Sequence, residues 1–526
     1  MTTRHPLVRH AGVVLFFLLF SAVWSWPLVL SPGRTTVALH FDVFPAAWLV
    51  DAAWTYLPDG VTERSAWPLG EPLARLDSFL FLAIAVLLGG AVPGLLLVNL
   101  FVLLGPVASA WAAWRFARED VGATDLAAVA AGLAFGFGPL AAVAALEGHV
   151  YFLFDPWLPL VASAAWRGRW PALALAFALA LLSTAYLGID ALFLALALVI
   201  GRLDRIGVPR ASACVAAMVG VGAAYAALYA LGPTAAARPE GDALARVGSA
   251  SLTTLFAWSP WMDLNRHSLA PAAGVAAAVL GVIGWWSTRA DRGRTALFVA
   301  STFALLGALG PTLEIGVTRD VLGPGPLRAL APLGIFDVWR FPVRLAWVSA
   351  LGFGALAATL PRTNAGALGV IALIVGDALL VAGAADRLRA HPTPTPAVYD
   401  LLPAGAVLEL YPEVGGMQED ITFYQQNISC FHQLRHGRPL LERCLNTDMR
   451  ASPRLAAARA VHAALLDERD PASVVRSLDV RSVVVHADLY QPHERGRVTQ
   501  GLIAAFGAPI AEGRDGGEWL MAWAVR

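Results

Sequence analysis

The chain has 526 residues, of which 57% are hydrophobic and 14% are charged, and its mean hydropathy is +0.62. This composition is too apolar for a soluble globular protein, and the chain is too long for one packed core, so we expect a polytopic membrane protein. The formal net charge is zero and no lysine occurs, so the chain has no basic face for binding nucleic acid.

The first apolar segment, residues 11–30, follows Arg4 and Arg9, which is the charge pattern of a signal sequence. Its apolar run is longer than the core of a usual signal peptide, and no A-x-A-like cleavage site follows it. We therefore predict a retained signal anchor.

Further apolar runs follow, and with the first they predict about eleven transmembrane helices. The runs lie at 11–30, 93–114, 124–142, 151–166, 171–187, 189–201, 211–231, 271–287, 295–310, 341–360 and 365–385. If the N-terminus is cytoplasmic, every short cytoplasmic loop contains arginine, as the positive-inside rule requires. These arginines are Arg115, Arg118, Arg167, Arg169, Arg202, Arg205, Arg210, Arg289, Arg292, Arg294 and Arg362.

Residues 79–88 are apolar enough to suggest another span, but counting them would place Arg115 and Arg118 outside and invert every later loop. We interpret this segment as an interfacial or re-entrant helix in the outer leaflet. Residues 31–92 then form one large outer loop, which belongs with a transmembrane domain of residues 1–385. Its tryptophans and tyrosine are typical of headgroup depth.

The third run contains "FGFGPL", where glycine and proline predict either a broken helix or a closely packed face of small residues. After the last span, "HPTPTP" forms a proline-spaced linker, so residues 386–526 are predicted to be a separate domain. Two strand-like runs, "AVLELYP" and "VRSVVVHADLY", and a helical stretch at 453–467 predict a small extracytoplasmic α/β domain.

The three cysteines differ in their expected surroundings. Cys214 lies in an apolar run and is expected to be a small core residue. Cys430 and Cys444 both fall in the extracytoplasmic domain, where a disulfide persists, so we predict that they form one. Two unrelated free thiols are the alternative.

Ionisable side chains gather at the predicted outer ends of the spans. Such residues are costly at membrane depth and are functional candidates by default. They are His40, Asp42, Glu147, His149, Asp190, Arg340 and Arg344.

The chemistry of these residue types is complementary. A carboxylate such as Asp42 is able to accept a proton from a hydroxyl nucleophile. Arg340 and Arg344 are one helical turn apart and suit bidentate binding of a phosphate. The structural alternatives are that Asp42 caps a helix and that Arg340 extends to lipid headgroups.

The pattern resembles bacterial members of the GT-C class, which are integral-membrane glycosyltransferases that use polyprenyl-phosphate sugar donors. The segments that carry the resemblance are the acidic first outer loop, "AWRFARED", "GH" before "WLPL", the turn at 186–188, "RFPVR" and "RHGRPL". It implies an all-α GT-C-like bundle and transfer of a sugar from the lipid-linked donor to an extracytoplasmic envelope glycan, lipid or protein. It also implies a multi-pass protein of the bacterial inner membrane, in contact with its lipids.

In that class a carboxylate of the first outer loop is catalytic, which by position maps to Asp42. The resemblance implies that His40, Glu147, His149, Asp190, Arg340 and Arg344 bind substrate. His40 and Asp42 have the spacing H-x-D, which suits a divalent metal, although a local hydrogen bond is the alternative. The sequence departs from the metal-dependent oligosaccharyltransferases, because no second acidic residue lies two positions from Asp42 and "WWDYG" is missing.

Other interpretations stay open at this point. Glu147 and His149 are also compatible with a polar patch that seals the bundle end. A non-catalytic GT-C-like protein in transport or assembly of lipid-linked glycans is the alternative function, although the inverted repeats typical of transporters are not evident. If the chain is a transferase, we expect Asp42, Arg340 and Arg344 to lie around one cavity.

Overall fold

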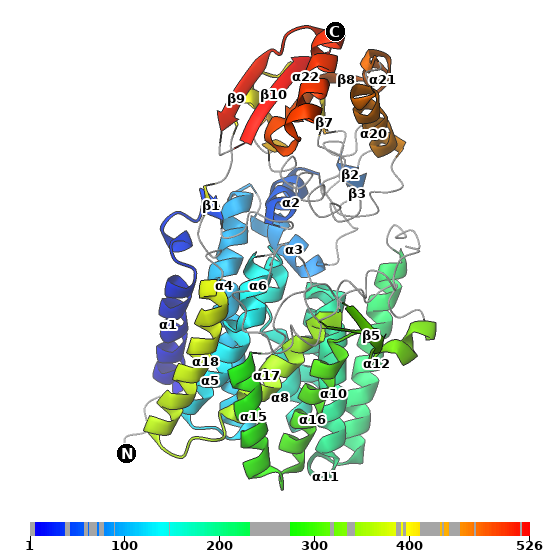
Figure 1. The fold of residues 1–526 in the computed structure, drawn as a ribbon. Helices are drawn as coiled ribbons and strands as arrows, with labels where there is room; N and C mark the ends of the chain where they lie inside the picture. Colours follow the sequence, from blue (N-terminus) through cyan, green and yellow to red (C-terminus); the bar gives the residue numbers. More distant parts are fainter. Residues whose placement is uncertain are drawn as a thin grey trace. The chain divides into compact units, whose positions relative to one another are not determined.

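The computed structural model describes most of the helices and the C-terminal sheet (Figure 1). The described residues are 6–36, 43–56, 61–62, 71–72, 78–88, 90–146, 148–231, 274–315, 320–333, 342–384, 391–392, 396–410, 432–433, 436–440, 453–467, 470–515 and 518–525. They fall into two compact units. The first contains Met1–Ser31, Asp77–Phe81 and Asn99–Ala390, and the second contains Pro32–Leu76, Leu82–Val98 and His391–Arg526.

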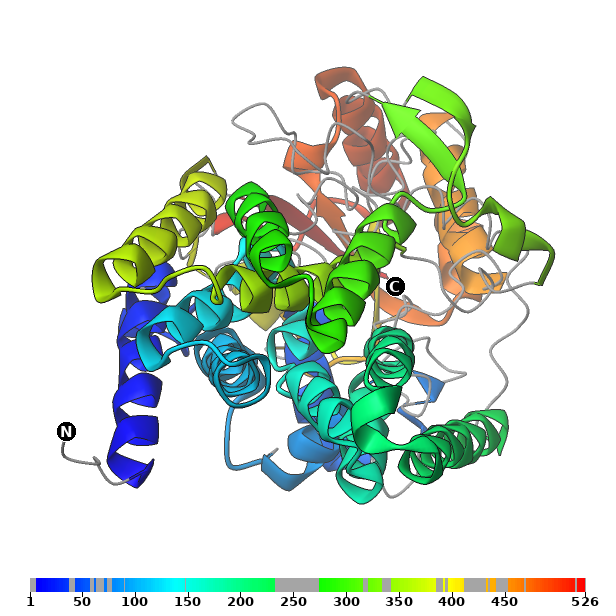
Figure 2. The same cartoon turned by 90° about the horizontal axis from the view of Figure 1, so that it is seen from below.

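The first unit is helical, and several of its helices are seen nearly end-on in Figure 2. Its helices and those that extend into it are α1 (Pro6–Trp24), α3 (Phe79–Leu88), α4 (Gly94–Phe116), α5 (Asp125–Gly136), α6 (Pro139–Leu146), α7 (Val150–Leu153), α8 (Trp157–Arg167), α9 (Trp170–Ser183), α10 (Ala185–Gly201), α11 (Leu203–Ile206), α12 (Val208–Leu231), α15 (Val275–Thr288), α16 (Arg292–Gly307), α17 (Ala346–Ala357) and α18 (Asn364–Ala384). Strands β4 (Thr312–Ile315) and β5 (Asp320–Pro324) form an antiparallel pair after α16. The π-helix η3 (Ala117–Val121) and three short 3-10 helices complete the described part of this unit: η1 (Leu28–Leu30), η4 (Arg328–Leu333) and η6 (Pro342–Leu345).

Four helical segments among the described residues are long and apolar enough to cross a membrane: Leu7–Trp24, Gly94–Val121, Asp125–Ala145 and Val208–Ala227. Most of the other apolar helices among the described residues are shorter, with 10–17 residues; α18 has 21 residues. Only 17% of the residues in the most apolar part of the first and of the last segment are buried, whereas 94% are buried in that of Asp125–Ala145. A hydrophobic helix with an exposed apolar surface is expected to face lipid, so this difference separates peripheral from central helices.

The arginine-bearing loops of the first unit meet at one end, here called the arginine end. Arg167 pairs with Glu119 at 3.0 Å, and Arg294 donates to the backbone oxygen of Val121 at 2.7 Å. Arg9 lies 3.8 Å from Asp125, so the start of α1 is at the same end. The ion pairs Arg202–Asp291 and Arg292–Asp204, at 4.0 and 3.8 Å, join the loops after α10 and α15 to this group. Four of the five loops that we predicted to share a side, at 115–118, 167–169, 202–210 and 289–294, therefore lie together.

Several helix boundaries differ from those predicted from hydropathy. The turn between α9 and α10 is at Thr184, not near 188, because Thr184 adopts an extended backbone and its hydroxyl accepts from the N–H of Tyr186. The run 151–166 is interrupted at 154–156, before α8. The "FGFGPL" segment separates α5 from α6, and a Cβ on Gly136 would lie 2.4 Å from the backbone oxygen of Pro106. Both predictions for this segment, a break and close packing, therefore apply.

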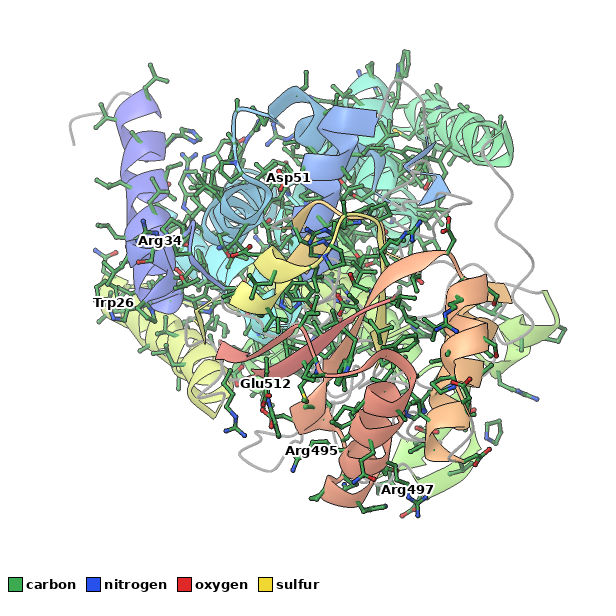
Figure 3. The ribbon with its side chains drawn as sticks, turned by 90° about the horizontal axis from the view of Figure 1, so that it is seen from above. Trp26, Arg34, Asp51, Arg495, Arg497 and Glu512 are labelled. Atoms are coloured by element: carbon green, nitrogen blue, oxygen red, sulfur yellow. The ribbon has the colours of Figure 1, made fainter. Side chains whose placement is uncertain are left out.

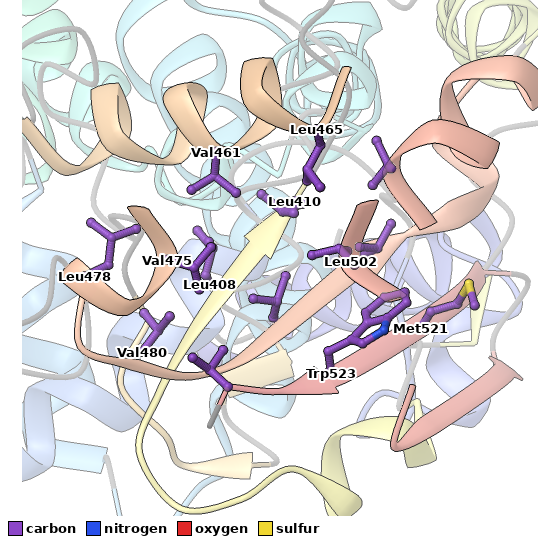
Figure 4. Close-up of a cluster of buried hydrophobic side chains, with 14 of the residues drawn as sticks. Leu408, Leu410, Val461, Leu465, Val475, Leu478, Val480, Leu502, Met521 and Trp523 are labelled. Atoms are coloured by element: carbon purple, nitrogen blue, oxygen red, sulfur yellow. The ribbon is translucent and has the colours of Figure 1, made fainter. Parts of the chain in front are cut away.

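The second unit contains the predicted C-terminal α/β domain. Its sheet has the order β7 (Ala406–Leu410), β8 (Val480–His486), β10 (Glu518–Ala524) and β9 (Ala511–Asp515). Strands β7 and β8 are parallel, and the other two pairs are antiparallel. Helices α20 (Pro453–Leu466), α21 (Ala472–Ser477) and α22 (Pro492–Phe506) supply side chains to its core, shown in Figure 4. The two predicted strands and the helix at 453–467 are confirmed.

The described parts of the outer loop belong to this same unit. Helix α2 (Val43–Tyr56) follows β1 (Thr35–Thr36), which pairs antiparallel with β6 (His391–Pro392) of the tail. Strands β2 (Val61–Thr62) and β3 (Glu71–Pro72) pair within the loop. Two 3-10 helices, η7 (Ala397–Leu401) and η9 (Ala487–Leu489), lie in the tail. The described parts of the outer loop thus belong to the same compact unit as the tail, whereas we predicted that residues 31–92 belong with the transmembrane domain of residues 1–385.

Candidate functional site

A group of aromatic and ionisable residues lies in the first unit, at the helix ends remote from the arginine end. Helices α8 and α10 both run toward the arginine end, because they finish at Arg167 and before Arg202. Their starts, with Asp155 just before α8 and Asp190 in the second turn of α10, therefore lie at the opposite end. The 3-10 helix η6 lies at the same end, because its Arg344 contacts Phe152, which precedes α8, and Tyr186, in the first turn of α10.

Arg344 lies over two aromatic rings, whose centroids are 6.4 Å apart and whose planes are tilted by 54° to each other. Its guanidinium carbon is 4.3 Å from the ring centroid of Phe152 and 4.2 Å from that of Tyr186. Both distances are within the range of cation–π attraction. These contacts restrict the position of the guanidinium, which is a group that binds carboxylate or phosphate oxygens through its N–H donors.

Asp190 provides a carboxylate in the same group. Its side chain is fully buried, and among the described residues neither of its oxygens has a hydrogen-bond partner. Its electrostatic neighbours are Asp155, which is repulsive, and Arg344, which is attractive. A buried carboxylate without hydrogen bonds is costly, so the arginine is the group that stabilises its charged form.

The turn before α8 positions Asp155. The hydroxyl of Ser109 donates to the backbone oxygen of Leu153 at 2.8 Å and accepts from the N–H of Asp155 at 2.8 Å. Asp155 Oδ1 then accepts from the N–H of Leu158 at 3.0 Å, which caps the start of α8. Its second oxygen, Oδ2, is buried and has no hydrogen-bond partner within the described part of the chain.

His149 lies beside the same aromatic residues. Its ring is 6.0 Å from the rings of both Tyr151 and Phe152 and is partly exposed. Phe152 therefore links His149 to Arg344. The structure thus brings together three predicted site residues. His149 and Arg344 both lie near the ring of Phe152, and Asp190 is an electrostatic neighbour of Arg344.

The other predicted site residues lie outside the described residues. They are His40, Asp42, Glu147, Arg340, Cys430 and Cys444. Cys214 is buried with a free thiol, as expected for a core residue. The described residues contain no group of three or more His, Cys, Asp or Glu side chains able to hold a metal ion.

Sequence reasoning missed Asp155 and Ser109. A local signal for Asp155 was present, because an aspartate followed by proline at the start of an apolar helix is a typical N-terminal cap. No comparable signal marks Ser109, which lies inside α4 and reaches Asp155 only through the packing of that helix.

Comparison with solved structures confirms the fold that the sequence suggested. The chain resembles the arabinofuranosyltransferase AftD from Mycobacteria with 17% identity and a TM-score of 0.55, over 98% of this chain and 40% of AftD. It resembles ArnT from Cupriavidus metallidurans bound to undecaprenyl phosphate with 14% identity and a TM-score of 0.53, over 97% of this chain and 98% of ArnT. The archaeal oligosaccharyltransferase AglB from Archaeoglobus fulgidus, bound to an inhibitory peptide and a dolichol-phosphate, gives 13% identity and a TM-score of 0.50, over 94% of this chain and 71% of AglB.

The sequence matches no protein-family profile and no curated protein. The structural similarity nevertheless shows that this multi-pass membrane protein has the fold of the GT-C glycosyltransferases. The chain spans less than half the length of AftD but nearly the whole of ArnT.

Proposed function

We propose that the protein transfers a sugar from a polyprenyl-phosphate donor to an extracytoplasmic acceptor. The observation that carries the proposal is the placement of Arg344 over the rings of Phe152 and Tyr186, near the buried Asp190. A guanidinium fixed in this way suits a phosphate at the membrane surface. The lipid phosphates bound to ArnT and AglB support a donor of this class.

The residues have separate roles in the proposed reaction. Arg344, together with Arg340, binds the donor phosphate, and the charge of Asp190 attracts the guanidinium of Arg344. The acceptor hydroxyl oxygen attacks the anomeric carbon, the bond from that carbon to the phosphate oxygen breaks, and polyprenyl phosphate leaves with the bonding electrons. Asp42 takes the hydroxyl proton as general base. His40, Glu147 and His149 bind the hydroxyl groups of the substrates.

The proposed orientation puts the arginine end in the cytoplasm. The arginine loops gather at one end of the first unit, as the positive-inside rule requires if about eleven helices span the bacterial inner membrane. The N-terminus is then cytoplasmic, and the tail is extracytoplasmic.

The non-catalytic alternative predicts a different lipid phenotype. A transferase-deficient deletion strain should accumulate a polyprenyl-phosphate sugar in the outer leaflet and lose that sugar from an envelope glycan, lipid or protein. Loss of a transporter should instead leave the lipid-linked sugar in the cytoplasmic leaflet. Mass analysis of extracted lipids, before and after treatment of intact cells with a membrane-impermeant periodate reagent, separates these outcomes. An unchanged lipid pool and unchanged envelope sugars would contradict both.

A further inference from the structure

The segment around "RHGRPL" has no role in the proposed chemistry, but the structure gives it one in the second unit. We call its described residues, 432–433 and 436–440, the strap. The backbone oxygen of Pro439 accepts from the N–H of Val407 at 2.9 Å, and Leu440 pairs in parallel with the same residue of β7. Arg438 Nη1 donates to the backbone oxygen of Tyr399 at 3.0 Å. The strap is therefore bonded to the edge of the tail sheet.

Gln433 connects the strap to the outer loop. Its Nε2 donates to the backbone oxygen of Arg438 at 2.8 Å, and its Oε1 accepts from the indole N–H of Trp48 at 2.5 Å. Gln433 and Trp48 have exposures of 0% and 1%. Since the donor and the acceptor of the amide each have a fixed partner, the strap holds the side chain of Gln433 in one orientation toward α2.

A buried polar network lies behind this contact. The hydroxyl of Tyr399 donates to Glu409 Oε1 at 3.0 Å and lies 2.9 Å from Nδ1 of His432. Glu409 Oε2 is 2.7 Å from Nε2 of His486. Burial lowers the pKa of the nearby Arg438, and the Asp400 carboxylate opposes that shift. These bonds tie His432, which directly precedes Gln433, to strands β7 and β8.

Helix α2 is held on a second side as well. Asp51 of α2, labelled in Figure 3, accepts through its Oδ1 from the N–H of Gly94 at 3.2 Å, at the start of α4. A Cβ on Gly94 would lie 2.0 Å from the backbone oxygen of Ala47. The two backbones are thus in direct contact. Trp48 and Asp51, one turn apart, hold α2 between the strap and the start of α4.

We infer that the strap is a positioning element for the outer loop, with Gln433 and Trp48 as its positioning residues. Helix α2 begins at Val43, directly after Asp42. Before residue 37, Thr35 and Thr36 of β1 pair with strand β6 of the tail. The tail therefore fixes both flanks of the segment that carries the proposed general base. This inference rests on the proposed function for its effect on catalysis, but not for the contact itself.

The contact is tested by hydrogen–deuterium exchange of the full-length protein in detergent. In Gln433→Leu and Trp48→Phe, the amides of 43–56 should exchange about 5- to 10-fold faster, the factor expected for one net hydrogen bond. The double variant should exchange no faster than the single ones, since both remove the same bond. Trp523→Phe is the matched control, because this buried tryptophan also loses one indole hydrogen bond, to the backbone oxygen of Gly507 at 3.1 Å. Equal exchange of 43–56 in all variants would overturn the inference.

The effect on catalysis is measured with the lipid-linked sugar that the deletion strain accumulates. Gln433→Leu should lower kcat by about 10- to 100-fold through misplacement of a reacting group, while KM for the donor and binding of undecaprenyl phosphate stay unchanged. Trp523→Phe should keep kcat near that of the wild type. If Asp42→Asn abolishes transfer but Gln433→Leu and Trp48→Phe leave kcat unchanged, the inference fails and the proposed function stands. If Asp42→Asn transfers normally, the proposed function fails, and the exchange experiment still decides the contact.

Discussion

Arg344 gives a prediction at the scale of one side chain. Arg344→Lys keeps the charge but loses the planar guanidinium that contacts both Phe152 and Tyr186. We expect the affinity for undecaprenyl phosphate to fall by about tenfold, the order of one desolvated cation–π contact, and Arg344→Ala to lose more. Isothermal titration of the purified protein measures this.

The matched control for this substitution lies at the arginine end. Arg289 has the same kind of contact, with its guanidinium carbon 4.2 Å from the ring centroid of Trp286. Arg289→Lys should leave the affinity for undecaprenyl phosphate unchanged. Equal affinities for Arg344→Lys, Arg344→Ala and the wild type would remove Arg344 from the donor site.

Gly94 gives a second prediction at this scale. A methyl group there would overlap the backbone oxygen of Ala47, so Gly94→Ala forces α2 away from the start of α4. We expect a destabilisation of about 1–3 kcal/mol, read as a lower midpoint of denaturant unfolding by tryptophan fluorescence. Gly220→Ala is the control, since a Cβ at this exposed helical position has no atom within 4 Å, and it should be neutral or slightly stabilising. Equal midpoints for the two variants would contradict the close packing.

The residues of the site were predictable to different degrees. Asp190 and Arg344 were candidates because ionisable residues at span ends are rare, and the structure brings their charges together. Asp155 was not predicted, since its position depends on Ser109 of a distant helix. The hydrogen bond between Trp48 and Gln433 joins residues that are 385 positions apart, and no local sequence pattern predicts such a contact.

At the scale of elements, hydropathy predicted where helices occur better than where they end. Long apolar runs correspond to α4 and α12, because length and composition determine such helices. The end of α9 depends on one side chain, Thr184, and the break before α8 on an aspartate–proline pair. A window average over about nineteen residues does not resolve a single cap.

The cysteines of the tail give a prediction for the loop that they enclose. Cys430 and Cys444 should be bonded to each other, which would stabilise the tail by roughly 3 kcal/mol in the chain-entropy model. Thiol labelling of the denatured protein before and after reduction counts the free thiols. We expect one labelled cysteine, Cys214, before reduction and all the cysteines afterwards. Complete labelling without reductant would exclude the bond.

The arrangement of the whole molecule was only partly visible in the sequence. Four of the five arginine loops that the positive-inside pattern grouped lie at one end of the first unit. This grouping was predictable because charge is read directly from the sequence. The association of the outer loop with the tail was not foreseen, since it depends on the pairing of β1 with β6 and on the strap. A proline-rich linker predicts the position of a domain boundary, but it does not predict which domain a distant loop packs against.

The membrane topology is a prediction for the entire chain. Reporter fusions after Arg118 and Arg210 should give cytoplasmic signals, and a fusion after Arg389 should give an extracytoplasmic one. The reason is that only about eleven spans place all the arginine loops on one side. A cytoplasmic signal after Arg389 would show that the count is wrong and that the tail faces the cytoplasm.

The central claim is that the protein is a transferase whose general base is Asp42. The most direct measurement is the rate of sugar loss from the accumulated donor in proteoliposomes that contain either wild-type protein or Asp42→Asn. We predict that the rate falls by a factor of about 10² to 10⁴, with unchanged thermal unfolding and unchanged affinity for undecaprenyl phosphate. Transfer by Asp42→Asn at the wild-type rate would contradict the account.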